Sequence, residues 1–136
     1  YFKPRYAGLI EAFRAVRPDV KIAYHSDGNI ESLLPEYIDI GVDILNAVQP
    51  KSMDTARLKR RFGNRLAFWG TLDIQETFPH GSPEDVVAEV RHRIRTVAPG
   101  GGLIIGPSHN FQPDVPMENI LAFYDAVDKY GVYPVV

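Results

Sequence analysis

The chain has 136 residues, a net charge of −2 and an apolar fraction of 45%, which is typical of one globular domain. No apolar run approaches the ~20 residues of a membrane span. The basic cluster at residues 57–61 fits the solvated face of a helix better than a nucleic-acid surface. The absence of cysteine excludes disulfides and thiolate metal sites, and it fits a cytoplasmic location. Because the chain does not begin with Met, we expect it to start within a longer protein.

The first part of the chain is predicted to form a helix, a strand and a second helix. Residues 5–17 carry apolar residues at helical spacing, and residues 20–24 form a short apolar run that predicts a strand. Residues 30–40 predict a turn followed by a helix with Pro35 near its start. The apolar positions of the first helix are Leu9, Ile10, Phe13 and Val16.

The rest of the chain alternates predicted strands and helices. Residues 83–97 give the clearest helix, because Ser82 and Asp85 form a capping-box pattern and Pro83 stands at the first helical position. The buried stripe of this helix is predicted at Val86, Val90, Ile94 and Val97. The remaining strands are predicted at residues 42–45, 66–69 and 103–106, and the remaining helices at 54–62, capped by Ser52 or Asp54, and 116–131.

The predicted order is one helix followed by four strand–helix units. The strands are short, apolar and non-alternating, which is typical of parallel strands covered on both faces. The doubly wound sheet and the (β/α)8 barrel both use such units, and four units make about half of a barrel. A polar pair follows every strand, which favours the rim of a barrel. These pairs are His25 and Asp27, Asn46 and Gln49, Asp73 and Gln75, and Ser108 and His109. We therefore expect an α/β fold of the (β/α)8 TIM-barrel type, with this chain as a half barrel.

His25 and Asp27 form the first candidate site. Side chains two residues apart on a strand point the same way, so both groups can meet one ion or handle one proton. The alternative is a loop-capping aspartate beside a hydrogen-bonded histidine. His109 follows the fourth predicted strand, where it is either a site residue or a loop histidine. Together, His25, Asp27 and His109 make a set of two histidines and one carboxylate, which suits zinc or ferrous iron.

Asp73, Trp69 and the glycines at residues 100–102 can each be interpreted in a structural or a functional way. Asp73 can bind a polar ligand or cap a turn, and Trp69 is predicted to lie in the core or in a pocket wall. The glycines at residues 100–102 precede a strand, whereas phosphate loops follow one, so their predicted role is structural. With Asn46, Gln49 and Gln75, the residues Trp69 and Asp73 are the predicted contacts of a small-molecule substrate.

Several stretches in one order resemble the uroporphyrinogen decarboxylase superfamily. The resemblance extends through nearly the whole chain and implies that residues 1–136 are the C-terminal half of a (β/α)8 barrel domain. It implies that the decarboxylase's catalytic aspartate and arginines lie in the N-terminal half. The residues that carry it are 25–28, 40–46, 48–50, 58–59, 62–63, 68–70 with Asp73 and Gln75, 100–104, 108–110, 112–116 and 118–119.

The resemblance implies two alternative chemistries. The decarboxylases remove acetate carboxylates from a tetrapyrrole without metal or cofactor, and His109 stands where their histidine after the last strand lies. The corrinoid-dependent methyltransferases hold zinc with a His-x-Cys and a later Cys, where this chain has His25-x-Asp27 and His109. Because carboxylate and imidazole can also hold zinc, the resemblance implies a variant zinc site. The methyl donor would then be a corrinoid (cobalamin) on a partner protein.

From these residues, a superfamily enzyme with a slight preference for metal-assisted, corrinoid-dependent methyl transfer is predicted. His109 and Asp27 are the predicted catalytic residues. Decarboxylation of uroporphyrinogen is the alternative. A second alternative is an inactive piece that acts as a structural module, because a half barrel has two open sheet edges and an exposed apolar interior. For that reason we also expect either self-association or an N-terminal half that closes the barrel.

Overall fold

The structure of the protein is a computed structural model that describes residues 1–135. Within these residues, no helix combines the length and the apolar character needed to cross a membrane. The elements in chain order are α1 (Lys3–Val16), β1 (Ala23–His25), the 3-10 helix η1 (Glu31–Leu33), α2 (Leu34–Asp39), β2 (Ile44–Asn46), α3 (Thr55–Phe62), β3 (Ala67–Leu72), α4 (Thr77–His80), α5 (Pro83–Val97), β4 (Leu103–Pro107) and α6 (Met117–Tyr130).

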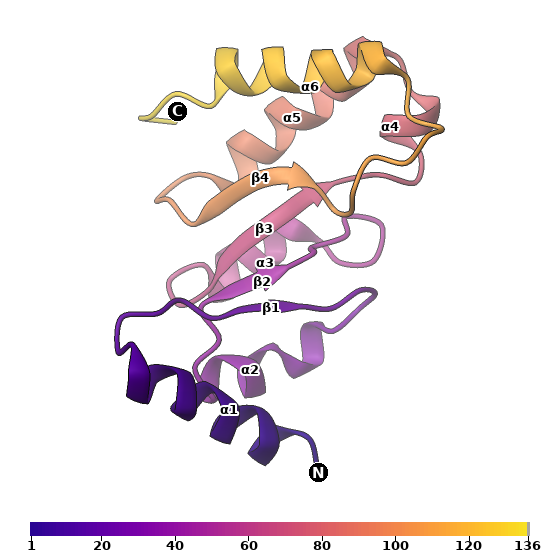
Figure 1. The fold of residues 1–136 in the computed structure, drawn as a ribbon. Helices are drawn as coiled ribbons and strands as arrows, with labels where there is room; N and C mark the ends of the chain where they lie inside the picture. The colour runs from indigo at the N-terminus through magenta and orange to yellow at the C-terminus, as the bar shows by residue number, and fades with distance from the viewer. Residues whose placement is uncertain (136) are drawn as a thin grey trace.

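The four strands form one parallel sheet in the order β1-β2-β3-β4. Each strand is joined to the next through a helical connection, as parallel neighbours require. Figure 1 shows α3 behind the sheet, with α1 and α2 beyond β1 and α5 and α6 beyond β4. This is the arrangement of a partial TIM barrel, and it confirms the predicted fold class.

The helix α5 forms as its sequence predicts. The Ser82 side chain accepts a hydrogen bond from the backbone N–H of Asp85, and the Asp85 side chain accepts one from the backbone N–H of Ser82. This capping box satisfies backbone donors that the first turn leaves without partners. The predicted buried stripe is confirmed at Val86, Val90, Ile94 and Val97.

The predicted start of the first strand is wrong and the helix α4 was not predicted, both for local reasons, and β2 and β3 are shifted from their predicted ranges of 42–45 and 66–69. The first strand begins at Ala23 and not at residue 20, although Ile22 is already joined to the start of β2: its N–H donates to the Asp43 carboxylate at 2.8 Å, and its carbonyl accepts from two backbone N–H groups. The helix α4 has only four residues, with Pro79 among them, and such a short piece gives no periodic signal.

The sheet has one covered face and one open face. Tyr24, Leu45 and Phe68 point to the covered face, where the helices pack. On the open face the side chains of Trp69 and Ile104 are exposed, with 43% and 45% of their surface accessible. The prediction that both faces are covered is therefore wrong for this chain, and the predicted exposed interior of a half barrel is observed.

The core on the covered face consists of two clusters. One lies around β1, β2 and α3 and includes Leu34, Leu45 and Leu58. The other joins α5 to α4 and α6 through residues such as Phe78 and Phe123. Leu103 packs against both clusters, so the two halves of the sheet share one continuous support.

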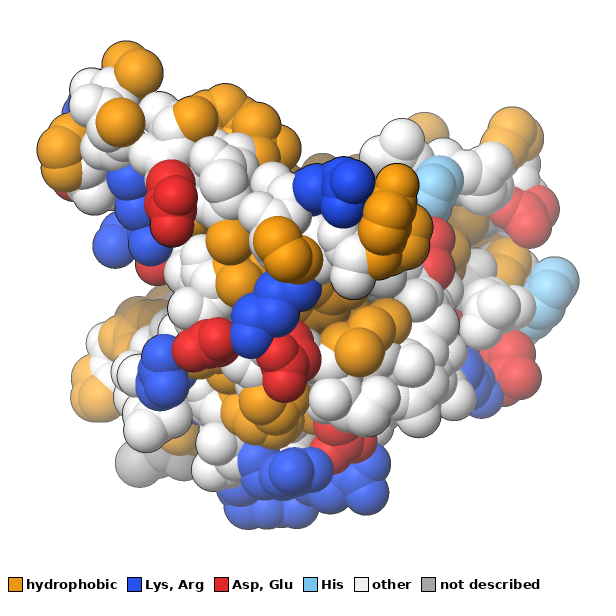
Figure 2. Space-filling view, turned by 90° about the horizontal axis from the view of Figure 1, so that it is seen from below, with side chains coloured by type: hydrophobic (Ala, Val, Ile, Leu, Met, Phe, Trp, Pro, Cys, Tyr) orange, Lys and Arg blue, Asp and Glu red, His pale blue; other side chains and the backbone are white. Residues whose placement is uncertain are grey.

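The helix α1 differs from its prediction. Ile10 is its one buried residue, whereas Leu9, Phe13 and Val16 are exposed. Figure 2 views the molecule from below and shows hydrophobic side chains at the surface among charged ones. The helical spacing of these apolar residues is correct, and no described part of the chain packs against their side of the helix.

Candidate functional site

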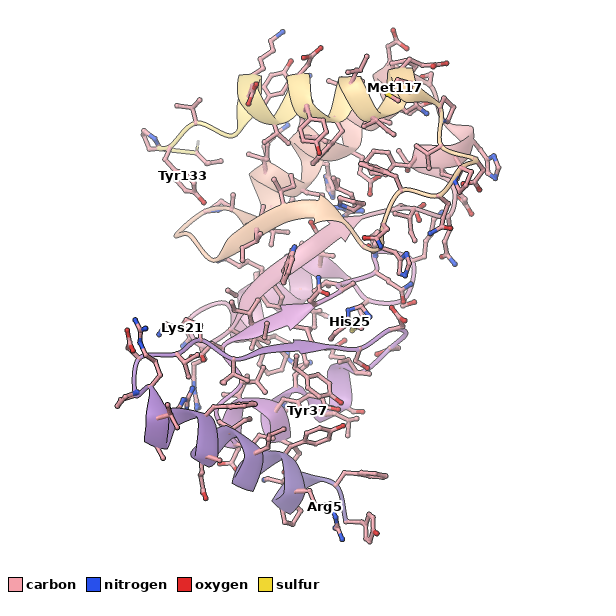
Figure 3. The ribbon with its side chains drawn as sticks, viewed as in Figure 1. Arg5, Lys21, His25, Tyr37, Met117 and Tyr133 are labelled. Carbon is pink, nitrogen blue, oxygen red and sulfur yellow. The ribbon has the colours of Figure 1, made fainter. Side chains whose placement is uncertain are left out.

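Four side chains form a row across the open face, with His25 and Asn46 at the carboxyl ends of β1 and β2 and with Trp69 and Ile104 within β3 and β4. His25 pairs with Asn46 in the β1–β2 register, and Trp69 pairs with Ile104 in the β3–β4 register. The Asn46 side chain joins the two pairs, because its Nδ2 donates to the Trp69 carbonyl at 3.4 Å. Figure 3 shows His25 at the edge of the sheet where the other strands also end. We call His25, Asn46, Trp69 and Ile104 the open-face row.

His25 and Asp27 lie together, as the spacing predicts. The Nε2 atom of His25 is 3.9 Å from Oδ1 of Asp27, and its Nδ1 atom is 2.6 Å from Oδ1 of Asn46. Both side chains are more than half exposed, at 56% and 64%. This part of the site is therefore open to solvent and to a ligand.

Gln49 holds the loop that carries Asp27. Its Oε1 accepts a hydrogen bond from the backbone N–H of Gly28 at 2.7 Å. Gly28 has a φ of 71°, a conformation that glycine adopts without a steric cost. Gln49 therefore supports the loop through this hydrogen bond, and its contact with a substrate stays a prediction.

Asp73 lies on the covered side of the sheet, away from the open-face row. Its side chain is 5% exposed, and its Oδ1 accepts from the backbone N–H of Gln75 at 2.9 Å. Its own N–H donates to Oε1 of Glu89 at 3.2 Å. Asp73 thus makes the turn-capping contact that was one of its two predicted readings, and the roles of Asp73 and Gln75 in substrate binding stay predictions.

The backbone of β3 explains why Asp73 turns away. Gly70 and Thr71 have φ values of 98° and 84°, which interrupts the alternation of side chains along the strand. Gly70, Thr71 and Leu72 are consequently buried in succession after the exposed Trp69. Left-handed backbone at a residue other than glycine is uncommon and tends to occur near functional sites.

Two charged residues that sequence reasoning missed join Asp73. Nη2 of Arg93 donates to Glu89 Oε1 at 2.9 Å, and Nη1 of Arg93 donates to Thr55 Oγ1 at 3.2 Å. Asp73, Glu89 and Arg93 are all largely buried, and we call them the buried charged cluster. The signal was available: Glu89 and Arg93 are an i, i+4 pair that flanks the apolar stripe of α5.

Lys51 lies at the edge of the buried charged cluster. Its ammonium donates a hydrogen bond to Glu76 and lies 4.0 Å from Oδ2 of Asp73. The hydrogen bond to Glu76 raises the pKa of Lys51, and the charges of Asp73 and Glu89 add to the rise. Lys51 is therefore a persistent positive charge beside two buried carboxylates.

His109 does not join the other predicted metal ligands. Its nearest polar partner is Gln112, whose Nε2 lies 3.4 Å from His109 Nδ1. Within residues 1–135, no three His, Cys, Asp or Glu side chains are grouped so that they could hold a metal ion. The residues present therefore do not assemble the donor set that zinc requires, and the set His25, Asp27 and His109 stays a prediction.

Ser108 is another residue whose role the sequence did not disclose. Its side chain is buried, and its Oγ donates to the Leu72 carbonyl at 2.6 Å. This bond ties the end of β4 to the end of β3. His109 therefore begins its loop from a fixed point on the rim.

Sequence comparisons identify relatives of this chain. The family model for uroporphyrinogen decarboxylase (URO-D) matches residues 1–130. The uroporphyrinogen decarboxylase of Pseudoalteromonas translucida (strain TAC 125) is 29% identical over 126 residues, which cover 91% of this chain and 33% of the relative. That of Serratia proteamaculans (strain 568) is 35% identical over 74 residues, covering 54% of this chain and 20% of the relative.

A solved structure agrees with the fold. A methyltransferase from Methanosarcina mazei superposes with a TM-score of 0.76 and 22% sequence identity, covering 97% of this chain and 36% of that one. At this identity the likeness establishes the fold alone. The chain spans about a third of the length of the P. translucida relative and of this structure.

Proposed function

The chain belongs to the uroporphyrinogen decarboxylase (URO-D) family, and from this premise we propose that the protein is an enzyme that decarboxylates a tetrapyrrole of the uroporphyrinogen type at the open face. The observation that carries the proposal is the pair His25 and Asp27 at the end of the open-face row. The named decarboxylases among its relatives support the choice of reaction.

The reaction requires a proton at a defined place. A C–C bond breaks, its electron pair stays on the substrate carbon, CO2 leaves, and one proton replaces it. His25 can hold that proton at Nε2, the ring nitrogen that lies 3.9 Å from Oδ1 of Asp27. Under this proposal His25 is added to Asp27 and His109 as a residue that handles protons.

The rest of the open-face row offers an apolar surface for the pyrrole rings of such a substrate. Trp69 offers an exposed indole, and Ile104 is its neighbour in the register. Aromatic faces pack well against planar rings, and polar groups at the border fix the orientation. The row thus places an apolar surface directly beside the proton-handling pair.

Methyl transfer is the second candidate. His25 and Asp27 are two of the three predicted zinc ligands and lie side by side. Zinc would supply an activated methyl acceptor, and a corrinoid on a partner protein would supply the methyl group. Because the described donors do not form a complete set, we derive no step through a metal.

The test is CO2 release from uroporphyrinogen by the intact protein, with and without a chelator. We expect release that survives the chelator, falls at least ~100-fold in His25→Gln and persists in His92→Gln, an exposed histidine on α5. A protein that releases no CO2 overturns the proposal. Bound zinc that is lost in His25→Ala and Asp27→Ala would support methyl transfer in its place, and a protein that neither releases CO2 nor binds zinc would favour the structural module.

A further inference from the structure

Asn46 has both ends of its side chain engaged by the protein. Its Nδ2 donates to the Trp69 carbonyl at 3.4 Å. The Oδ1 atom is therefore the end that faces His25, at 2.6 Å from Nδ1 of the ring. Because an amide oxygen only accepts hydrogen bonds, Nδ1 of His25 must be the donor.

This contact determines where the proton of a neutral His25 resides. A neutral imidazole carries one N–H, and the hydrogen bond made by one nitrogen sets the state of the other. The Nε2 atom is then left with a free lone pair. Its nearest described acidic group is Asp27, whose Oδ1 at 3.9 Å is too far to accept a hydrogen bond from it.

We infer that Asn46 is a positioning residue that holds His25 as the Nδ1–H tautomer and directs Nε2 toward the reacting side. The inference rests on the proposed function in one respect, which is that His25 acts on the substrate. It also gives Asn46 a role beyond the predicted substrate contact, which stays a prediction, because each polar atom of its side chain already makes one hydrogen bond within the protein.

The backbone holds the two residues in register. His25 and Asn46 are partners in the parallel pairing of β1 and β2, and the backbone N–H of Ser26 donates to the Asn46 carbonyl at 2.7 Å. The anchor at Trp69 prevents the amide from turning its nitrogen toward the ring. Asn46 is thus preorganised as an acceptor before any substrate binds.

The tautomer sets the direction of proton transfer. A proton that His25 takes from solvent enters at Nε2, and the same proton leaves from Nε2 when it replaces CO2 on the substrate carbon. The ring then returns to the Nδ1–H form that Asn46 stabilises. A ring held as the other tautomer would return its proton from the side that faces the sheet.

Nitrogen-15 NMR of the imidazole rings tests the inference without substrate. The intact protein is labelled and measured at a pH where the rings are neutral, and the His25 signals are assigned by their loss in His25→Gln. We expect Nδ1 at the position of a protonated ring nitrogen and Nε2 at that of an unprotonated one. In Asn46→Ala the two positions should exchange, toward the Nε2–H form that a free histidine side chain favours.

Two variants serve as controls. Asn46→Asp keeps an acceptor oxygen, so the parent pattern should persist, and Asp27→Ala should leave it unchanged because Asp27 makes no hydrogen bond to the ring. A parent protein with its proton on Nε2 overturns the inference, as does an exchange in Asp27→Ala or a parent pattern in Asn46→Ala. Backbone amide spectra verify the fold of each variant. Activity does not enter, so the result is separate from that of the CO2 assay.

Discussion

The open-face row and the buried charged cluster lie at the same edge of one sheet but on opposite faces. His25 in the first, like the neighbouring Asp27, is more than half exposed, and its Nε2 makes no hydrogen bond to Asp27. Asp73, Glu89 and Arg93 in the second are largely buried, and Glu89 accepts hydrogen bonds from both of the others. The comparison teaches that a polar residue after a strand can belong to the site or to the scaffold, and that the face of the sheet decides which.

The buried charged cluster should show the largest effect on stability. Arg93→Ala leaves Glu89 buried without its guanidinium partner, and we expect a loss of about 3 kcal/mol in the free energy of unfolding. Chemical denaturation measures it, with His92→Ala as the exposed control on the same helix. A loss below about 1 kcal/mol would remove the distinction between the two regions.

The left-handed backbone at Gly70 in β3, which directs the following residues to the covered face, should give the second largest effect on stability. Gly70 has a φ of 98°, and an added Cβ would lie 3.4 Å from the Pro107 carbonyl oxygen. Gly70→Ala is therefore expected to cost about 1–2 kcal/mol of unfolding free energy. Gly106→Ala is the matched control, because no atom lies within 4 Å of its added Cβ and its φ is not positive. Equal unfolding free energies of Gly70→Ala and Gly106→Ala would contradict the claim that a side chain at position 70 is strained.

The cap of α3 gives a smaller effect that depends on pH. Asp54 Oδ1 accepts from the backbone N–H of Arg57, and this bond lowers the pKa of Asp54 below its ordinary value of 3.8. We expect Asp54→Ala to cost about 1 kcal/mol of unfolding free energy at neutral pH.

The sign of the pH effect follows from the lowered pKa of Asp54. Above pH 3.8 the carboxylate is charged in both states and the cap contributes fully. As the pH falls below 3.8 toward the lower folded pKa, that contribution is lost, so the stability gap between the parent protein and Asp54→Ala should shrink. Denaturation curves at several pH values measure the gap. Asp54→Asn keeps the cap without the charge, so the stability gap between Asp54→Asn and Asp54→Ala should not change with pH. If this gap shrank at low pH as the parent's does, the assignment would be contradicted.

Substitutions of His25, at the end of the open-face row, and of the neighbouring Asp27 should have the smallest effect on stability. His25→Ala and Asp27→Ala remove exposed groups, and each is expected to change the unfolding free energy by no more than about 0.5 kcal/mol. Thermal and chemical unfolding of both variants check this. A loss comparable to that of Arg93→Ala would mean that the row also serves the scaffold.

The sequence predicted the order of the strands and of the longer helices because each of these carries a local signal. The capping box at Ser82 and the apolar stripe ending at Val97 identify α5. The two-residue spacing of His25 and Asp27 predicted that they lie together, although β1 ends at His25 and Asp27 is in the loop that follows. These are short-range relations, which periodicity and capping rules describe.

The direction of Asp73 could not be predicted in the same way. It depends on two left-handed residues, and one of them, Thr71, carries no sequence signal for that conformation. The role of Asn46 was also hidden, because its partners His25 and Trp69 lie on neighbouring strands. Long-range contacts of this kind follow from the register of the sheet.

CO2 release from uroporphyrinogen by the intact protein, compared between the parent and His25→Gln, tests the central claim most directly. The account predicts release by the parent and a loss of at least ~100-fold in the variant, with unchanged unfolding free energy. Equal rates in the two proteins would contradict the claim that the open face is the site of reaction.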